Sequence, residues 1–380
     1  MDFSLSDEQN DFVAAIRDFC DRECGTQDQR ERLTEGYREH HSFDVYKQMA
    51  ELGWLGVTIP ERYGGSGGSM LDACLFMEET SRGLAPIGGY ATTLIVAGAT
   101  QRFGTEEQKS EILGGIAAGA VEAIAMTEPE AGSDVGALTT KAERVDGGFV
   151  INGQKVFISN AHIADHVLVV CRTTKGDSKH EGMTMIWVPR EAEGMEIVPI
   201  ETMGGRETNT LYFSDCAAPE SAVLGTVDQG WTQLMAGLNV ERLILAATML
   251  GIAQRAFDDA LAYAKERRQF GRPIASFQTL QHRFADLATD LEAARLMTRL
   301  VATLTDEDPD RMLPKEASMV KLFVTEVAKR TTLEGMQMMG GYGYSSEYDM
   351  ERLVRTTLVS TIYGGTSEIQ RGIIAKTLGL

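Results

Sequence analysis

The spacing of apolar residues changes twice along this 380-residue chain, and that change constrains the fold more than any single motif. Helical spacing begins at Ser6-Asp7-Glu8-Gln9 and fills roughly the first 120 residues. From about Val121, short β-type runs follow one another, with turn residues at 146–148 and 152–153. Helical spacing returns at Trp231. The pattern predicts an α+β chain with an α-helical domain at 1–120, an antiparallel β-barrel or sandwich at 121–225 and an α-helical domain at 226–380.

Within these three parts the positions of most elements follow from the same spacing. Helices are expected at 6–19, 43–52, 71–82, 92–103, 106–119, 277–304 and 315–339, after Glu347 and from Thr366. Strands are expected at 121–129, 149–159, 165–173, 183–189, 195–201 and 209–215. The acidic run at 306–310 predicts a linker between helices.

The longest predicted helix covers 238–274, where Leu, Ala and Met dominate and Gly271-Arg272-Pro273 ends the pattern. Steps of three and four residues place one polar side chain, Glu241, in the middle of an apolar stripe. The stripe consists of Leu234, Leu238, Leu245, Thr248 and Ile252. A carboxylate among apolar neighbours is costly to desolvate. Either an ion pair with an arginine such as Arg242 explains it, or a base whose proton affinity is raised by a dry pocket.

Composition excludes several classes of protein. Hydrophobic residues make up 43% of the chain, which provides a large core, and 36 basic against 55 acidic residues give a charge of −19. That charge argues against nucleic acid and anionic membrane surfaces as partners. The five cysteines are scattered, and Cys20 and Cys24 lack nearby His or Cys partners, so neither a disulfide scaffold nor a metal site is expected. We find no signal segment and no apolar run near 18 residues, which predicts a cytoplasmic protein without a membrane span.

The clearest chemical motif is the string Met126-Thr127-Glu128-Pro129-Glu130-Ala131-Gly132-Ser133-Asp134. A strand ends there in a proline-containing turn, and Gly-Ser-Asp then exposes backbone N–H groups and hydroxyls. Thr127 and Ser133 are suited to hold the polar edge of a ring or a phosphate oxygen. Taken alone, the string is equally compatible with an ordinary turn between a strand and a loop.

This string resembles the signature of the acyl-CoA dehydrogenase family of flavoenzymes. Further blocks similar to that family follow in the family's order at 156–160, 267–271, 277–278, 337–343 and 362–371, so the likeness covers essentially the whole chain. The resemblance implies a helical domain, a β-barrel and a four-helix-bundle-like C-terminal domain. It also implies FAD as cofactor and a homo-oligomer, a dimer of dimers, that acts in fatty acid or branched-chain acyl catabolism such as β-oxidation.

The same resemblance implies which residues bind FAD. Thr127 and Ser159 match positions that hydrogen-bond the isoalloxazine, Phe157 matches the aromatic residue that packs on it, and Ser133 matches a position near the pyrophosphate and the thioester ligand. The other implied positions are Ile124, Met126, Ile158, Arg267, Phe270, Gln278, Gln337, Gly340, Gly341, Thr366 and Glu368. Arg267, Phe270, Gln278 and 337–341 would reach the FAD of a neighbouring subunit. Simpler roles also exist: Gly340 could end a helix and Thr366 could cap one.

The family's reaction is α,β-desaturation of an acyl-CoA thioester, in which a carboxylate takes the α-proton while a hydride leaves the β-carbon for flavin N5. Most members carry that Glu directly after the Tyr of the last block, where this chain has Gly364. A minority, including isovaleryl- and long-chain acyl-CoA dehydrogenases, place it in a Glu-Arg-Leu context on the long helix. Glu241 occupies that position, so we expect it to be the base.

The implied substrate positions are Ser133, Leu238, Asn239, Arg242, Tyr363, Gly364 and Gly365. A base moved to the helix and a wall reduced to Gly364-Gly365 should leave room for a branched or bulky acyl group. By resemblance, electrons would pass to an electron-transferring flavoprotein. Three alternatives remain: a family member that does not desaturate, such as a desulfinase-like enzyme, an oxidase, and an inactive scaffold that binds flavin or CoA.

Overall fold

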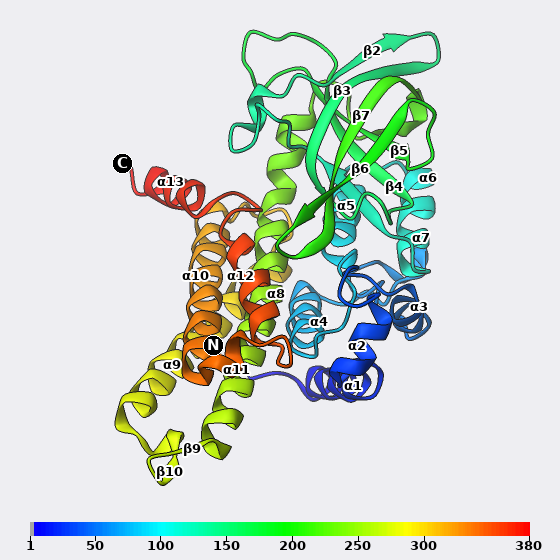
Figure 1. Ribbon diagram of the computed structural model, residues 1–380. Coiled ribbons are helices and arrows are strands. Elements are labelled where there is room, and N and C mark those ends of the chain that lie inside the picture. Colours follow the sequence, from blue (N-terminus) through cyan, green and yellow to red (C-terminus); the bar gives the residue numbers. More distant parts are fainter. Residues whose placement is uncertain (1–3) are drawn as a thin grey trace. The chain divides into compact units, whose positions relative to one another are not determined.

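The computed structural model describes residues 4–380, and the order of its elements is helical, β, helical, which confirms the predicted α+β class (Figure 1). Contacts divide the chain into two compact units. Unit 1 contains the residues up to Arg30, Ser69–Ala85 and Arg242–Leu380. Unit 2 contains Glu31–Gly68 and Pro86–Glu241. The predicted division at 120 and 225 follows the order of element types along the chain and remains a prediction.

Unit 1 is helical, and α10 is at its centre, in contact with α9, α12 and α13. Helix α1 begins at the predicted cap: Ser6 and Gln9 form a reciprocal capping box. Helix α4 contacts both α1 and α9. The helices of this unit are α1 (Asp7–Cys24), α4 (Met70–Arg82), α8 (Gly230–Glu266, from Arg242 onward), α9 (Gln278–Glu307), α10 (Pro314–Met339), α11 (Gly341–Tyr344), α12 (Met350–Ser360) and α13 (Ser367–Thr377), with a 3₁₀ turn at Ile274–Ser276.

The long helix differs from its predicted bounds at both ends. Helix α8 begins at Gly230 and ends at Glu266, eight residues before the predicted end. Strands β9 (Arg268–Gln269) and β10 (Arg272–Pro273) form a hairpin instead, because Phe270 and Gly271 both adopt left-handed backbone conformations that a helix excludes. The predicted stripe is only partly correct: Leu234 and Ile252 are buried, whereas Leu238, Leu245 and Thr248 are half-buried.

Helix α8 also contradicts the expectation that no segment is long and apolar enough to span a membrane. Within residues 4–380 it meets the length and composition of such a span. In its most apolar 18-residue window, 56% of the residues are buried inside the protein. The core helix of a folded protein meets the same criteria.

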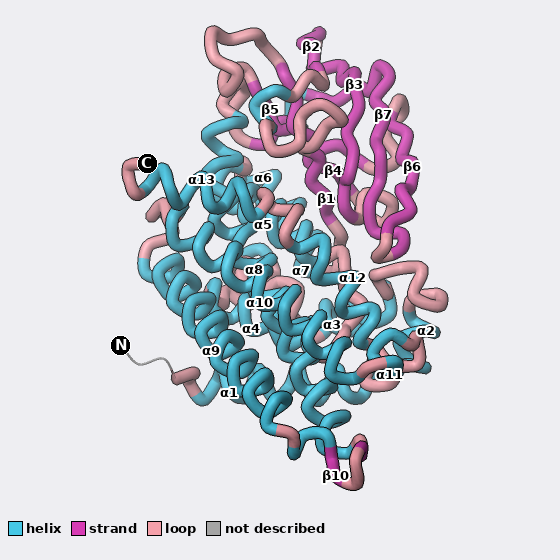
Figure 2. The backbone as a smooth tube through the Cα atoms, turned by 60° about the vertical axis from the view of Figure 1, so that its left-hand side comes forward, coloured by secondary structure: helices cyan, strands magenta, loops and turns pink. Residues whose placement is uncertain are grey.

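Unit 2 contains short helices and one eight-stranded sheet (Figure 2). Its helices are α3 (Phe43–Glu51), α5 (Tyr90–Phe103), α6 (Glu106–Gln108) and α7 (Gly114–Ala117), with a π-helical turn at Lys109–Leu113 and 3₁₀ turns at Glu61–Tyr63, Val135–Ala137 and Glu220–Ala222. Helix α2 (Gln27–Leu33), at the division between the units, was not expected from the sequence. The core of unit 2 packs α5 and the π-helical turn against β4, β5 and β8.

The strands of the sheet are β1 (Glu122–Ala125), β2 (Lys141–Val145), β3 (Gly148–Ser159), β4 (His166–Arg172), β5 (Met183–Pro189), β6 (Met195–Thr202), β7 (Gly205–Pro219) and β8 (Val223–Leu224). The order is β6-β7-β3-β2-β4-β5-β8, with β1 joined to β4. The pairs are antiparallel as predicted, except that β4 pairs in parallel with β1 and β2. Strands β2 and β8 were missed.

One predicted turn is wrong. Asn152-Gly153 lies inside β3, at a register shift between Ile151 and Gly153. The Gly153 φ is +148°, and a Cβ there would lie 2.7 Å from the Thr140 hydroxyl oxygen. This glycine therefore serves a β-bulge with close backbone approach rather than a hairpin.

Candidate active site

Unit 2 brings three of the expected FAD residues onto neighbouring segments. Strand β1 ends just before Met126-Thr127, and the Val156 N–H of β3 donates to the Thr127 carbonyl at 2.9 Å. Phe157 follows, with a φ of +58° and 64% of its surface exposed. Ser159, two residues further along β3, is also exposed. We call Thr127, Phe157 and Ser159 the ring shelf.

The ring shelf fits a flat ring with polar edges. An exposed phenyl ring offers a stacking surface, and within residues 4–380 the Thr127 and Ser159 hydroxyls make no hydrogen bond of their own. A bulky residue in the left-handed region is strained, and such strain concentrates at functional sites. These observations fit the isoalloxazine of FAD.

The remaining expected residues of this unit are placed less directly. Ile158 is 2% exposed, so its side chain does not reach the surface of the ring shelf, and its carbonyl accepts from Asn209 Nδ2 at 3.0 Å. Ile124 and Met126 are half-buried against the core. Ser133 is exposed in the loop after the Glu128–Ala131 turn, next to Asp134, which pairs with Lys179 at 2.8 Å. Ser133 is thus accessible to a ligand.

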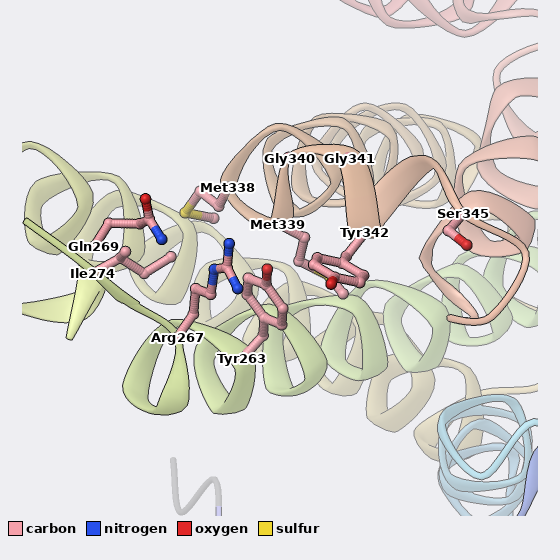
Figure 3. Close-up of a pocket in the computed structure, with 10 residues that line it drawn as sticks. All are labelled: Tyr263, Arg267, Gln269, Ile274, Met338, Met339, Gly340, Gly341, Tyr342 and Ser345. Atoms are coloured by element: carbon pink, nitrogen blue, oxygen red, sulfur yellow. The ribbon is translucent and has the colours of Figure 1, made fainter.

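Unit 1 contains a cavity of about 540 Å³ that gathers a second group of expected residues (Figure 3). It is lined by Tyr263, Arg267, Gln269, Ile274, Met338, Met339, Gly340, Gly341, Tyr342 and Ser345. Figure 3 shows Arg267 and Tyr263 pointing from the end of α8 toward the segment around Met339 and Tyr342. The Arg267 guanidinium lies 5.6 Å from the centre of the Tyr342 ring. An arginine at this place suits a phosphate-bearing ligand, whereas the Gly340 N–H already donates to the carbonyls of Met336 and Gln337.

Other expected residues of unit 1 lie outside this cavity lining. Phe270 is 92% exposed at the tip of the β9–β10 hairpin, where its ring packs edge-on against Phe277 at 6.0 Å. Gln278, at the start of α9, and Gln337, near the end of α10, are exposed. Gly340 ends α10 with a φ of +63°, as its alternative role predicted. Contacts of these residues with a neighbouring subunit remain a prediction.

The turn before α13 carries the expected substrate residues Tyr363, Gly364 and Gly365. Both glycines have left-handed φ values, +59° and +82°. Thr366 caps α13 as predicted and accepts from the Ile369 N–H at 3.3 Å. Glu368 is exposed, and hydrogen bonds from its own backbone N–H and from Thr366 lower its pKa.

The candidate base is on the continuous helix α8. Glu241 is 7% exposed and Arg242 is buried to the same degree, while Leu238 and Asn239 are half-buried one turn earlier. The burial expected from the apolar stripe is therefore confirmed for Glu241. Its role as base remains a prediction.

Sequence reasoning missed two buried lysines beside these residues. Lys155 and Lys321 have no exposed surface, and each donates to the backbone carbonyl of an expected site residue, Met126 and Gly365 respectively. The only signal was their position inside β-type and helical runs of apolar residues. No cluster of His, Cys, Asp and Glu that could hold a metal occurs within residues 4–380, and the five cysteines are buried and free of disulfides.

Protein-family models match nearly the whole chain. The N-terminal domain of acyl-CoA dehydrogenase matches residues 6–120, the middle domain 123–216 and the C-terminal domain 228–379. Together they span the ring shelf, α8 and the cavity of unit 1.

Relatives extend over the full length. A probable acyl-CoA dehydrogenase, YngJ, of Bacillus subtilis is 38% identical and covers 100% of both chains. The caffeyl-CoA reductase–Etf complex subunit CarC of Acetobacterium woodii is 36% identical over 98% of both. The mitochondrial isovaleryl-CoA dehydrogenase of Solanum tuberosum is 38% identical over 88% of this chain and 82% of its own.

A solved structure agrees with the fold. Butyryl-CoA dehydrogenase from Megasphaera elsdenii superposes with a TM-score of 0.92 at 32% identity and covers 100% of both chains. The family is FAD-dependent, in agreement with the ring shelf. The chain belongs to the acyl-CoA dehydrogenase family of FAD-dependent oxidoreductases, which oxidise or reduce acyl-CoA thioesters.

Proposed function

We propose that this enzyme desaturates an acyl-CoA thioester between the α and β carbons, with Glu241 as the base that takes the α-proton. One observation carries the proposal. Glu241 is buried on α8, whereas Gly364, which cannot accept a proton through a side chain, stands where the family resemblance implies the usual base. A buried carboxylate is retained when it has a function or a compensating partner.

In this proposal each residue of the site has a separate role. Glu241 removes the α-proton in a site shielded from bulk water, where a base acts on a weak carbon acid more effectively. Bound FAD supplies the hydride acceptor. Arg242 contributes positive charge near the thioester, and the backbone of Gly364-Gly365 forms a wall without side chains. That wall favours a branched or bulky acyl group, and the relatives include an isovaleryl-CoA dehydrogenase.

A second direction of the same chemistry is supported by a relative. CarC, at 36% identity, is named as part of a reductase complex with an electron-transferring flavoprotein. For this chain the same partner class would accept electrons in desaturation or supply them in reduction. We propose desaturation as the main direction, in a homo-oligomer located in the cytoplasm.

The test is anaerobic mixing of the FAD-loaded enzyme with straight and branched acyl-CoAs, followed by loss of the oxidised flavin absorbance. Glu241→Gln keeps the size of the side chain and removes the base. We expect it to bind FAD and thioester normally while the rate of flavin reduction falls about 10²- to 10⁴-fold, the usual contribution of a general base.

Glu266→Gln is the matched control, because it makes the same chemical change at an exposed position of the same helix. It should reduce flavin at the wild-type rate. If Glu241→Gln does so too, Glu241 is structural. If none of the acyl-CoAs reduces the flavin of the wild type, the desulfinase-like or scaffold alternative applies. Rapid formation of peroxide in air would indicate an oxidase.

A further inference from the structure

A fully buried ion pair lies directly behind the ring shelf. The Lys155 Nζ is 2.9 Å from Glu128 Oε1, and the two side chains have 0% and 4% of their surface exposed. Both residues belong to unit 2, Lys155 in β3 and Glu128 just after β1. Neither contributes a side chain to the surface that would meet a ligand.

The pair fixes the backbone of three segments. Lys155 also donates to the Met126 carbonyl at 3.0 Å, so it ties β3 to the residue before Thr127. Glu128 accepts from the Thr139 N–H at 2.6 Å and hydroxyl at 2.9 Å, and from the Thr140 N–H at 2.8 Å. The end of β1, the start of β2 and the middle of β3 therefore converge on one carboxylate and one ammonium.

Stability alone is a poor explanation for this arrangement. Desolvating both charges offsets most of their attraction, and apolar replacements of a buried pair are often neutral. Burial raises the pKa of Glu128, but the charge of Lys155 and the hydrogen bonds from Thr140, Lys155 and Thr139 outweigh it and lower that pKa to about 2. Burial lowers the pKa of Lys155, against the opposing effect of Glu128. The four hydrogen bonds to Glu128 favour its ionised form, and we take the pair as charged at neutral pH.

The backbone next to the pair is strained. Phe157 holds a φ of +58°, and β3 shifts register against β7 between Lys155 and Ile158. A bulky residue persists in that conformation only when its surroundings determine it strongly. The Val156 N–H bond to the Thr127 carbonyl and the Lys155 bond to the Met126 carbonyl fix the two residues that precede Phe157.

We propose that Lys155 and Glu128 are positioning residues for the cofactor: they set the spacing and orientation of Thr127 and Phe157 on the ring shelf. The inference rests on the FAD roles of Thr127 and Phe157, but not on Glu241 as base. Losing the pair should weaken FAD binding and alter the environment of the ring even where the protein remains folded.

The test compares apoproteins titrated with FAD. In the double variant Lys155→Met/Glu128→Gln both charges are removed, similar volumes are retained, and one amide oxygen remains to accept from either Thr139 or Thr140. We expect the apoprotein to remain folded with a lower melting temperature, because the Met126 carbonyl and one threonine N–H lose their partners. The FAD dissociation constant should rise about tenfold or more, comparable to losing a hydrogen bond, and the visible circular dichroism of bound FAD should change.

Arg295→Met/Glu78→Gln is the matched control, because it removes an ion pair of 3.0 Å in unit 1 by the same chemical changes. It should bind FAD with wild-type affinity and an unchanged visible spectrum. Wild-type FAD affinity and visible circular dichroism in the Lys155/Glu128 variant would show that the pair is only structural. If that variant does not fold, Glu128→Asp, which keeps the charge and both acceptor oxygens but shortens the side chain, decides by the same two readouts. Failure of Glu241→Gln to slow flavin reduction would leave these readouts unaffected.

Discussion

Lys321 shows how one buried side chain can shape the proposed acyl wall. It has no exposed surface, and its ammonium donates to the carbonyls of Ser360 and Gly365, each at 2.9 Å. Its Nζ also lies 6.0 Å from the centre of the Tyr363 ring. Gln370 donates to the carbonyls of Gly364 and Gly365 at 2.9 and 3.0 Å. The turn before α13 is therefore held from inside unit 1, although its glycines impose no side-chain restraint.

We predict that Lys321→Met loosens this turn. The Ser360 carbonyl loses its lysine donor at a cost of about 1–3 kcal/mol, while the Gly365 carbonyl keeps Gln370, so the melting temperature should fall by a few degrees. Because the acyl wall becomes less defined, the ratio of kcat/KM for branched over straight acyl-CoAs should also shrink. Lys329→Met, on the same helix, should change neither quantity. If Lys321→Met lowers the melting temperature but leaves the kcat/KM ratio unchanged, the turn does not determine which acyl group is preferred.

At the scale of elements, β1 is flanked by two buried glutamates with opposite behaviour. Glu122, at its start, accepts from Trp187 Nε1 at 2.9 Å and lies 3.4 Å from His166 Nδ1. Burial raises the pKa of Glu122 despite these two partners. Glu128, just after the strand, has its pKa lowered from 4.5 to about 2 by Lys155 and the threonines, against the effect of burial. Folding therefore makes Glu122 easier to protonate and Glu128 harder to protonate.

The two glutamates should therefore give opposite pH dependences of stability. Between pH 4.5 and about 2 the unfolded state binds more protons at Glu128, so its contribution, about 3 kcal/mol, is lost as pH falls. Above pH 4.5 the folded state binds more protons at Glu122, so stability is lost as pH rises. Melting temperatures against pH should show Glu128→Gln converging on wild type in acid and Glu122→Gln gaining on wild type toward neutral pH. Parallel curves would contradict both assignments.

Local signals predicted most elements, whereas the failures arise from pairing with residues far away in the sequence. The capping box at Ser6 and the threonine at 366 gave helix starts to within a residue, because caps act over one turn. Asn152-Gly153 is a strong hairpin signal in isolation, but the pairing of β3 with β7 across it is set by residues some 60 positions away. The burial of Lys155 was missed for the same reason, because only the register of the sheet shows that this lysine faces the interior.

Within the candidate site, the sequence identified the buried carboxylate Glu241 but not the buried ion pair of Lys155 and Glu128. Glu241 stood out because a charge broke an apolar stripe, and its burial is confirmed. The ring shelf residues came from motif resemblance, since exposed Thr, Phe and Ser have no pattern of their own. Glu128 was within the motif, yet its pairing with Lys155 joins residues 27 positions apart and could not be read from either alone.

For the whole molecule, the exposed aromatic residues of unit 1 predict association of copies of this chain. Phe270 is 92% exposed in a strained conformation, and Tyr342, Tyr344 and Tyr348 are exposed beside the cavity region. Burying one phenylalanine side chain stabilises an interface by about 2 kcal/mol. In a chain with net charge −19, apolar surface that is exposed in the single chain marks a place where a partner or a ligand binds.

We predict that Phe270→Ser shifts the enzyme toward smaller species, with a dissociation constant raised roughly 30-fold for about 2 kcal/mol. Because Arg267 and the hairpin are proposed to complete the FAD site of a neighbouring subunit, the same variant should release FAD on dilution. Sedimentation velocity across a concentration series, with flavin absorbance recorded in parallel, measures both effects. Met312→Ser, which removes an exposed hydrophobic residue between α9 and α10, should change neither. If Phe270→Ser dissociates but retains FAD as tightly as wild type, the hairpin contributes to assembly alone, and the cofactor site is complete within one subunit.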